Sequence, residues 1–252
     1  MKEEMYGHIH SIERTHWWYV ARRKIVFDWV SQALADREAP RVLDIGCGTG
    51  FNLEQLRRIE TIHSGHGYAV GLDFSSEALR FCRSRNLTRL VCGDGTRSPL
   101  RGESFDLIMA LDVIEHLEDD GQAVREFARV LKPGGAVIIF APAFGFLWGL
   151  QDEVSRHYRR YTAAELREKL ESAGLTIDKL TYANAFLFPL IWAGRLVLRW
   201  SGHEIQGTSE NDLHPQWSNG LLQAIFSVER PLLRHISLPL GVSLLCVARK
   251  PT

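Results

Sequence analysis

A short apolar stretch that runs directly into a glycine-dense turn is the feature that most constrains the fold of this chain. Residues 41–45 (Arg-Val-Leu-Asp-Ile) predict a buried strand, and residues 51–59 predict the helix that follows it. Between them, Gly46, Gly48 and Gly50 let the backbone bend tightly and let a ligand approach the main chain closely. The first backbone N–H groups of the helix then face that ligand, as in nucleotide sites at the carboxyl ends of parallel strands.

The spacing of the glycines separates two classes of cofactor. A dinucleotide site typically has G-x-G-x-x-G beside a pyrophosphate, whereas this chain has G-x-G-x-G with Asp44 two residues before the first glycine. A carboxylate there repels a pyrophosphate but suits a ligand that carries an ammonium group. The stretch from Val42 to Gly50 (Val-Leu-Asp-Ile-Gly-Cys-Gly-Thr-Gly) resembles the motif of the class I S-adenosylmethionine-dependent methyltransferases. The alternative is a structural turn that binds no ligand.

Acidic residues end the next predicted strands in the order that this resemblance implies. Residues 68–73 predict a second strand that ends in Asp73, and Asp94 follows the third. The resemblance implies that Asp73 accepts hydrogen bonds from the ribose, that Phe74 lies against the adenine and that Asp94 lies near its amino group. The predicted cofactor-binding residues are Asp44, Gly46, Gly48, Gly50, Asp73, Phe74, Asp94, Gly95, Leu111, Arg22 and Arg23.

The resemblance covers about residues 40–181 and implies an α/β fold. We expect a Rossmann-like, doubly wound sheet of seven strands in the order 3-2-1-4-5-7-6, with strand 7 antiparallel. Residues 105–111 predict the fourth strand, and the Leu-Lys-Pro-Gly-Gly sequence at 131–135 predicts a turn before strand five. The expected organisation is an N-terminal helical lid over residues 1–36 and a methyltransferase domain over 37–252. A helical insertion is expected at about 183–235.

The N-terminal helix contains three consecutive aromatic residues and then two arginines, in residues 16–23 (His-Trp-Trp-Tyr-Val-Ala-Arg-Arg). Consecutive aromatics on a helix cannot all face one core stripe, so at least one should face a cleft. We predict that Tyr19 contacts the acceptor. The resemblance implies that Arg22 or Arg23 meets the methionine carboxylate of the cofactor. The alternative is a helix packed on the sheet through Trp17, with solvated arginines.

An apolar segment followed by a basic, aromatic one lies after the fifth strand, in residues 144–161. It resembles the H-x-R-R-Y-T stretch of a bacterial subgroup that also carries the N-terminal His-Trp-Trp signature. We expect Arg159 or Arg160 to bind an anionic or polar acceptor near His157. The alternative is a basic patch that flanks the cap of the next helix. The predicted acceptor residues are Tyr19, Trp148, Arg159, Arg160 and Tyr161.

The chemistry follows from the cofactor that the resemblance implies. Its sulfonium methyl is already activated, so the enzyme mainly aligns the acceptor for displacement. A general base matters only for an acceptor that holds its proton at neutral pH, such as a hydroxyl. His116 and His157 are the candidates for that catalytic role, with a structural role as the alternative for His116. We predict no metal site, because the histidines show no ligand spacing.

Residues 186–200 are strongly apolar, but they fall short of the ~20 residues that span a membrane and contain Arg195 and Arg199. Such a helix suits peripheral contact with a membrane or an apolar acceptor, or a lid or homodimer contact. The chain has 30 basic and 30 acidic residues, so it has no general attraction for polyanions and we expect no nucleic-acid partner. Its charged start predicts a cytoplasmic protein, with membrane-peripheral binding as an option.

These features predict an enzyme that transfers a methyl group from S-adenosyl-L-methionine to a small-molecule or lipid- or glycan-linked acceptor, with S-adenosyl-L-homocysteine as product. One alternative is a non-catalytic S-adenosylmethionine-binding or scaffolding protein. A nicotinamide oxidoreductase is a second alternative, but the glycine spacing argues against it.

Overall fold

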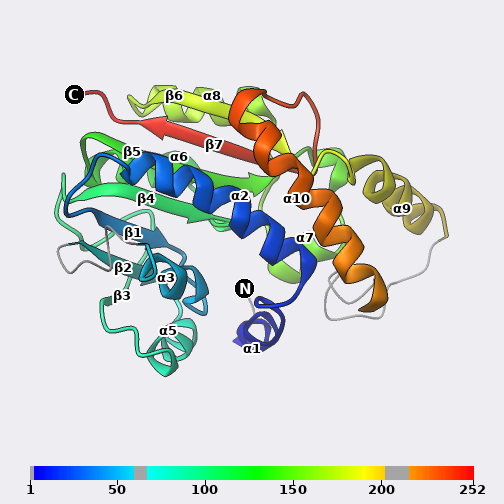
Figure 1. Ribbon diagram of the computed structural model, residues 1–252, viewed down its shortest axis with the longest axis horizontal. Helices are drawn as coiled ribbons and strands as arrows, with labels where there is room; N and C mark the ends of the chain where they lie inside the picture. Colours follow the sequence, from blue (N-terminus) through cyan, green and yellow to red (C-terminus); the bar gives the residue numbers. More distant parts are fainter. Residues whose placement is uncertain (1–2, 60–66, 202–215) are drawn as a thin grey trace.

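A seven-stranded sheet forms the centre of the molecule (Figure 1). The computed structural model describes residues 3–59, 67–201 and 216–252. The strand order is β3-β2-β1-β4-β5-β7-β6, with β7 antiparallel to both of its neighbours and the other pairs parallel. The predicted order and the antiparallel seventh strand are confirmed. The strands are β1 (Arg41–Ile45), β2 (Tyr68–Asp73), β3 (Leu90–Cys92), β4 (Phe105–Leu111), β5 (Leu131–Pro142), β6 (Thr176–Ala183) and β7 (Ser243–Arg249).

Helices cover both faces of this sheet, which is why the central strand β4 and residues 136–142 of β5 are buried without a break instead of alternating with exposed residues. In Figure 1, α2 and α10 cross the front face side by side, and α6 and α8 lie behind it. The helices are α1 (Glu3–Ile12), α2 (Trp17–Leu34), α3 (Phe51–Leu56), α5 (Ser76–Ser84), α6 (Asp120–Val130), α7 (Leu150–Ser155), α8 (Ala163–Ser172), α9 (Phe188–Ser201) and α10 (Asn219–His235). Short 3-10 turns are η1 (Ile114–His116), η2 (Gly145–Leu147) and η4 (Gln216–Ser218).

The hydrophobic core has two halves, one on each side of the sheet. On the front face, Ile25 of α2 and Phe226 of α10 are buried together with the strand residues whose side chains point toward that face. On the back, Phe127 of α6 and Leu166 of α8 fill the corresponding layer. β4 is buried over its whole length because it lies at the centre of the sheet between both layers.

Two local expectations differ from the structure. The Leu-Lys-Pro-Gly-Gly sequence lies inside β5, where the register against β4 shifts between Phe105 and Leu107. Gly134 has φ +71°, and a Cβ on Gly135 would lie 2.9 Å from the carbonyl oxygen of Lys132. The predicted turn is therefore an irregularity within β5, which continues on both sides of it. The first helix after the glycine turn ends at Leu56 instead of residue 59, and part of the predicted insertion, 202–215, lies outside the described residues.

The N-terminal helix α2 is bound to the late helix α10. Asp28 forms ion pairs with Arg230 and Arg234. At the N-terminal end of α2, the Asn219 side chain accepts a hydrogen bond from the backbone N–H of Trp17 at 2.8 Å and donates one to the carbonyl of Thr15 at 2.9 Å. These contacts fix the start of α2 above the carboxyl ends of the strands.

Candidate active site

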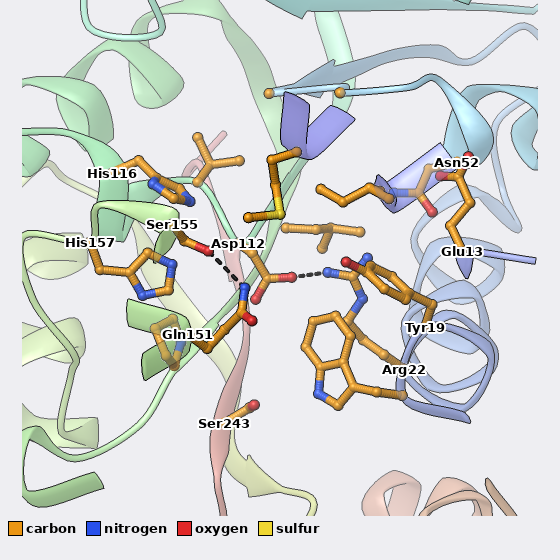
Figure 2. Close-up of a pocket in the computed structure, with 18 of the residues that line it drawn as sticks. Glu13, Tyr19, Arg22, Asn52, Asp112, His116, Gln151, Ser155, His157 and Ser243 are labelled. Atoms are coloured by element: carbon orange, nitrogen blue, oxygen red, sulfur yellow. Dashed lines mark hydrogen bonds and ion pairs between the residues drawn. The ribbon is translucent and has the colours of Figure 1, made fainter. Parts of the chain in front are cut away.

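A pocket of about 1130 Å³ opens at the carboxyl ends of the parallel strands. The loops after β1, β2, β3 and β4 form one side of it, and residues of α1, α2, α7 and α9 form the other. Every parallel strand ends at this edge of the sheet, so side chains distant in sequence meet here. The close-up in Figure 2 shows Arg22 and Asp112 near its centre, with His116 and His157 on one side and Glu13 and Asn52 on the other.

The glycine turn follows β1, and its three glycines have different roles. Gly46, Gly48 and Gly50 all have positive φ. A Cβ on Gly48 would meet nothing closer than 3.9 Å, so its backbone is open to the pocket. A Cβ on Gly50 would lie 2.7 Å from both Cys82 Sγ and Leu87 Cδ1. Gly46 and Gly48 are among the residues that line the pocket. The predicted cofactor residue Gly50 is not, and it instead allows α3 to pack closely against α5.

Asp44 lies beneath this turn and is almost fully buried. Its Oδ2 atom has no hydrogen-bond partner among the described residues. Burial, reinforced by the nearby charge of Asp73 and opposed by Arg22, raises the pKa of Asp44 to about 7. Asp44 is not among the described residues that line the pocket, and it immediately precedes Ile45 and Gly46, which do.

Arg22 reaches from α2 to the end of β4 and pairs with Asp112 (Figure 2). Its guanidinium lies 4.5 Å from the ring centroid of Trp18, and its Nε atom is buried without a hydrogen-bond partner among the described residues. Asp112 has φ +55°, a conformation that costs energy for a residue with a Cβ and that clusters at functional sites. Burial lowers the pKa of Arg22, and the neighbouring Tyr19 and Asp44 oppose that shift.

The ends of β2 and β3 bring three further predicted residues to the pocket. Asp73 accepts hydrogen bonds from the backbone N–H groups of Gly48 at 2.8 Å and Ser75 at 2.9 Å. Phe74 is 71% exposed, which is unusual for a large apolar ring beside a pocket. Asp94 lies on the same wall. Predicted residues Gly95, Leu111 and Arg23 also line the pocket.

The three consecutive aromatics of α2 all contribute to the pocket wall. Trp17 also meets Phe226 of α10 edge to face at 6.2 Å, and Trp18 meets Phe140 of β5 at 6.3 Å. Tyr19 faces the cavity beside Arg22 (Figure 2), and burial raises its pKa to about 12, so its hydroxyl stays neutral.

A buried charge cluster joins α7 to the segment that follows it. Arg160 binds both oxygens of Asp152 at 2.8 Å, and His157 Nδ1 lies 2.7 Å from Asp152 Oδ1. Burial alone would raise the pKa of Asp152, but the His157 hydrogen bond and the Arg160 charge lower it to about 2. Asp152 therefore remains ionised, and its carboxylate fixes the Nδ1–H tautomer of His157.

His116 lies against His157, with ring centroids 4.6 Å apart and the planes nearly perpendicular. Burial, reinforced by His157, lowers the pKa of His116 to about 3. The adjacent Glu115 is fully buried, and burial raises its pKa to about 8. At neutral pH the His116 ring is therefore uncharged.

The structure does not bring three of the predicted acceptor residues to the pocket. The Tyr161 ring is in the core, and its hydroxyl donates to Ile114 O and Asp120 Oδ2. Arg159 turns toward Asp120 and the carbonyl of Glu118. Neither of these nor Trp148 is among the described residues that line the cavity. Adjacent residues on an extended segment point in opposite directions, so only Arg160 of the arginine pair faces inward.

Several pocket residues could not be selected from the sequence. Asp112 lines the pocket and pairs with Arg22, which lies far away in the chain. Asp152 does not line the pocket, but it binds His157 and Arg160, which do. Glu13 is buried, and its carboxylate accepts from Thr49 Oγ1 at 2.5 Å and pairs with Arg85. These are charged residues in ordinary helix or loop patterns, and only their partners in the folded chain distinguish them.

The comparisons with known proteins agree with this geometry. Residues 43–139 match the family model described as a methyltransferase domain. A probable S-adenosylmethionine-dependent methyltransferase of Mycolicibacterium smegmatis is 30% identical over 173 residues, which cover 68% of this chain and 63% of that protein. The human probable tRNA methyltransferase 9B is 29% identical over 158 residues, 61% of this chain and 31% of that protein. The chain therefore spans less than two thirds of the length of these relatives.

Among solved structures, a chain of the complex between the Haloferax volcanii Trm112 methyltransferase activator and a methyltransferase superposes on this protein with a TM-score of 0.60 at 22% identity, and the match covers 99% of this chain and 95% of that one. This likeness concerns the fold. The glycine turn and the acidic strand ends indicate the same type of protein as the match over residues 43–139. The chain is similar to S-adenosylmethionine-dependent methyltransferases, with the match to the methyltransferase domain over residues 43–139, and S-adenosylmethionine is the cofactor that this similarity implies.

Proposed function

We propose that the chain transfers a methyl group from S-adenosylmethionine to a small-molecule or lipid-linked acceptor and releases S-adenosylhomocysteine. The observation that carries this proposal is the continuity of one pocket from the glycine turn, past Asp112, to His157 and the apolar residues of α9. Ligand pockets commonly measure about 300–1,000 Å³. A pocket of about 1130 Å³ therefore has room for a cofactor and an acceptor side by side.

The groups around the turn fit the amino-acid end of the cofactor. Arg22 Nε is a buried donor and Asp44 Oδ2 a buried acceptor, and neither has a partner among the described residues. Unpaired buried polar groups are costly. The carboxylate of the methionine moiety would satisfy the first, and its ammonium would satisfy the second. Arg23 is less suited, because it donates to the carbonyl of Glu13 at 2.7 Å and lies over the Phe51 ring.

The ends of β2 and β3 fit the nucleoside end. Each Asp73 oxygen accepts one backbone hydrogen bond and retains capacity for a ribose hydroxyl. Phe74 offers an exposed ring on which an adenine can stack. Asp94 and Gly95 follow on the same wall, where the adenine edge would lie.

When bound, the cofactor supplies an activated sulfonium methyl, so the main task of the protein is to align the acceptor and exclude water. His157 is our candidate for the base that takes a proton from an acceptor hydroxyl, because Asp152 holds Nδ1 and leaves Nε2 as the acceptor atom. His116 is the second candidate, but its lowered pKa makes it the weaker base. Tyr19 and Arg160 line the same space and complete the proposed acceptor site.

One part of the acceptor side of the pocket is apolar. Leu187, Leu190 and Ile191 of the α9 region and Leu222 of α10 line it. We propose that these side chains hold an apolar portion of the acceptor. Residues on α9 that face away, such as Trp192 and Val197, are exposed. A lipid surface is the proposed contact for that face, and a second copy of the chain is the alternative. In the described part of the chain, no helix is both long and apolar enough to cross a bilayer.

A tRNA acceptor is the second candidate function. Several of the similar proteins are named tRNA methyltransferases, among them the human protein above and a macaque protein named as a tRNA carboxymethyluridine methyltransferase. The balanced charge of this chain argues against binding a polyanion without a partner protein. Transfer of labelled methyl groups to bulk tRNA, compared with lipid and small-molecule extracts, distinguishes the two acceptors.

The first experiment is calorimetric titration with S-adenosylmethionine and S-adenosylhomocysteine, followed by transfer of labelled methyl groups to acceptor extracts. Micromolar binding with turnover is the expected result. Binding without turnover on any extract would favour the non-catalytic, cofactor-binding alternative. The matched variant is Asp73→Asn, which keeps the shape of the side chain but loses the charge, and it should weaken cofactor binding by ~1–3 kcal/mol. Wild-type affinity in this variant would contradict the assignment of Asp73 to the ribose.

A further inference from the structure

Glu115, His116 and His157 converge at one point beside the pocket. One potential ligand atom from each side chain lies within 4.8 Å of the other two. Glu115 and His116 belong to the short η1 turn after β4, and His157 follows α7. The backbone N–H of Tyr158 donates to the carbonyl of Glu115 at 2.8 Å and ties the two segments together. The sequence alone predicted no metal site, because it could not show that His157 lies beside the η1 turn.

Glu115 is the unusual member of this cluster. It is 0% exposed, and neither of its carboxylate oxygens has a hydrogen-bond partner among the described residues. The charges of Arg160 and Arg22 act on it from a distance, but these residues bind Asp152 and Asp112 directly. A buried carboxyl group is costly to ionise without a partner, and the buried charges of proteins are paired or coordinate a metal ion.

The surroundings of both histidines resemble those of metal ligands. A histidine that binds a metal usually donates its other ring N–H to a carboxylate or a backbone carbonyl. His157 has this arrangement, because Asp152 Oδ1 lies 2.7 Å from its Nδ1 and leaves Nε2 for an ion. The backbone of Ser155 and Arg156 faces the His116 ring and opposes the lowering of its pKa. The His157 ring is thus oriented by Asp152.

We propose that Glu115, His116 and His157 bind one divalent transition-metal ion at the floor of the pocket. Two imidazoles and one carboxylate suit Zn²⁺, Co²⁺ or Fe²⁺, whereas Mg²⁺ prefers oxygen ligands. Small adjustments of the three side chains would bring their ligand atoms to bonding distance. Since His116 and His157 line the cavity, the remaining coordination positions of the ion face the space assigned to the acceptor.

An ion in that position can bind an acceptor oxygen and lower the pKa of its hydroxyl. This role rests on the proposed function, whereas metal binding itself does not. His157 Nε2 would then be a ligand instead of a free base.

The test uses the full chain after treatment with a chelator and its removal. Co²⁺ is added while the visible absorption is recorded, and Zn²⁺ and Mg²⁺ are then added in competition. We expect one equivalent of Co²⁺ with visible bands, displaced by Zn²⁺ and not by Mg²⁺. Glu115→Gln and His157→Gln should each weaken binding by more than about 100-fold, beyond the ~10–100-fold typical for loss of an outer partner, as in Asp152→Asn.

His235→Gln is the matched control, because His235 is exposed at the end of α10. It should bind Co²⁺ like the wild type, and thermal unfolding of each variant checks its fold. No stoichiometric binding by the wild-type chain, or binding that survives both Glu115→Gln and His157→Gln, overturns the proposal. S-adenosylmethionine titration in the presence of chelator measures the cofactor site separately, so failure of the metal site and failure of the proposed methyl transfer are distinguishable.

Discussion

Arg22 of α2 and Asp112 after β4 form an ion pair across the pocket and connect the N-terminal helices to the sheet. The side chain of Arg22 is buried, and that of Asp112 is partly exposed to the cavity. One partner thus comes from the segment that we propose to cover the cofactor, and the other from the floor of the site. A ligand that reaches Arg22 Nε therefore binds a guanidinium already held in position.

The first prediction concerns this arginine. Arg22→Gln should weaken binding of S-adenosylmethionine and S-adenosylhomocysteine about 10- to 100-fold, because a hydrogen bond to a charged group contributes ~1.5–3 kcal/mol. Calorimetry measures the dissociation constants. Arg167→Gln is the control, since Arg167 pairs with Glu171 on the exposed face of α8. Equal affinities in the wild type and the Arg22 variant would remove Arg22 from the cofactor site.

The pKa of Asp44 gives a prediction about stability and pH. Its folded-state pKa of about 7 is above the ordinary value near 3.8, so the folded protein holds a proton that the unfolded chain releases. The free energy of unfolding contributed by this group therefore falls as pH rises from about 4 to about 7, and it is constant above that. Asp44→Asn should remove this component. Urea unfolding at several pH values, wild type against variant, measures the difference, and parallel profiles would contradict it.

The sequence was sufficient to predict where β1, β2 and β4 lie, but it did not show which side chains pair with each other in the folded chain. β1, β2 and β4 begin and end at the predicted residues, because buried parallel strands appear as continuous apolar runs. The glycine turn could also be predicted, because the spacing of its glycines determines the local backbone geometry. By contrast, the Arg22–Asp112 pair joins residues that are distant in the chain and depends on how α2 packs.

The acceptor side was the least predictable part. The H-x-R-R-Y-T stretch contains two arginines that point to different places, Arg159 toward Asp120 and Arg160 toward Asp152, and Tyr161 lies in the core. The direction of these side chains depends on the positions of β5 and η1 in the fold, and the sequence pattern gives no information about those positions. The approach of His157 to His116 has the same origin.

Glu229 of α10 provides a prediction about stability. It is 0% exposed, and its carboxylate accepts hydrogen bonds from the backbone N–H groups of Asn184 and Ala185, both at 2.7 Å, and of Phe186 at 3.0 Å. Glu229→Gln replaces one oxygen with an amide that faces N–H groups. The free energy of unfolding should fall by about 1.5–3 kcal/mol. Denaturant unfolding measures it, with the exposed Glu168→Gln as control, and a loss no larger than in that control would contradict the assigned role.

Leu190 of α9 tests the nature of the acceptor. It lines the pocket and is still 65% exposed, so it lies where an acceptor would enter. Leu190→Ser should lower kcat/KM for an acceptor with an apolar chain by roughly 5- to 30-fold, equivalent to ~1–2 kcal/mol of lost apolar burial. The affinity for S-adenosylmethionine and the turnover of a short, water-soluble acceptor should not change.

Val197→Ser is the matched control for this variant, because Val197 is equally exposed on the same helix but does not line the pocket. If both variants lose activity only when the acceptor is presented in lipid vesicles, the exposed face of α9 contacts the lipid surface as a whole. If only Leu190→Ser loses activity, and does so with detergent-dispersed acceptor as well, the apolar chain of the acceptor lies in the pocket. Wild-type kinetics in both variants would exclude α9 from acceptor binding and move the entrance toward α7.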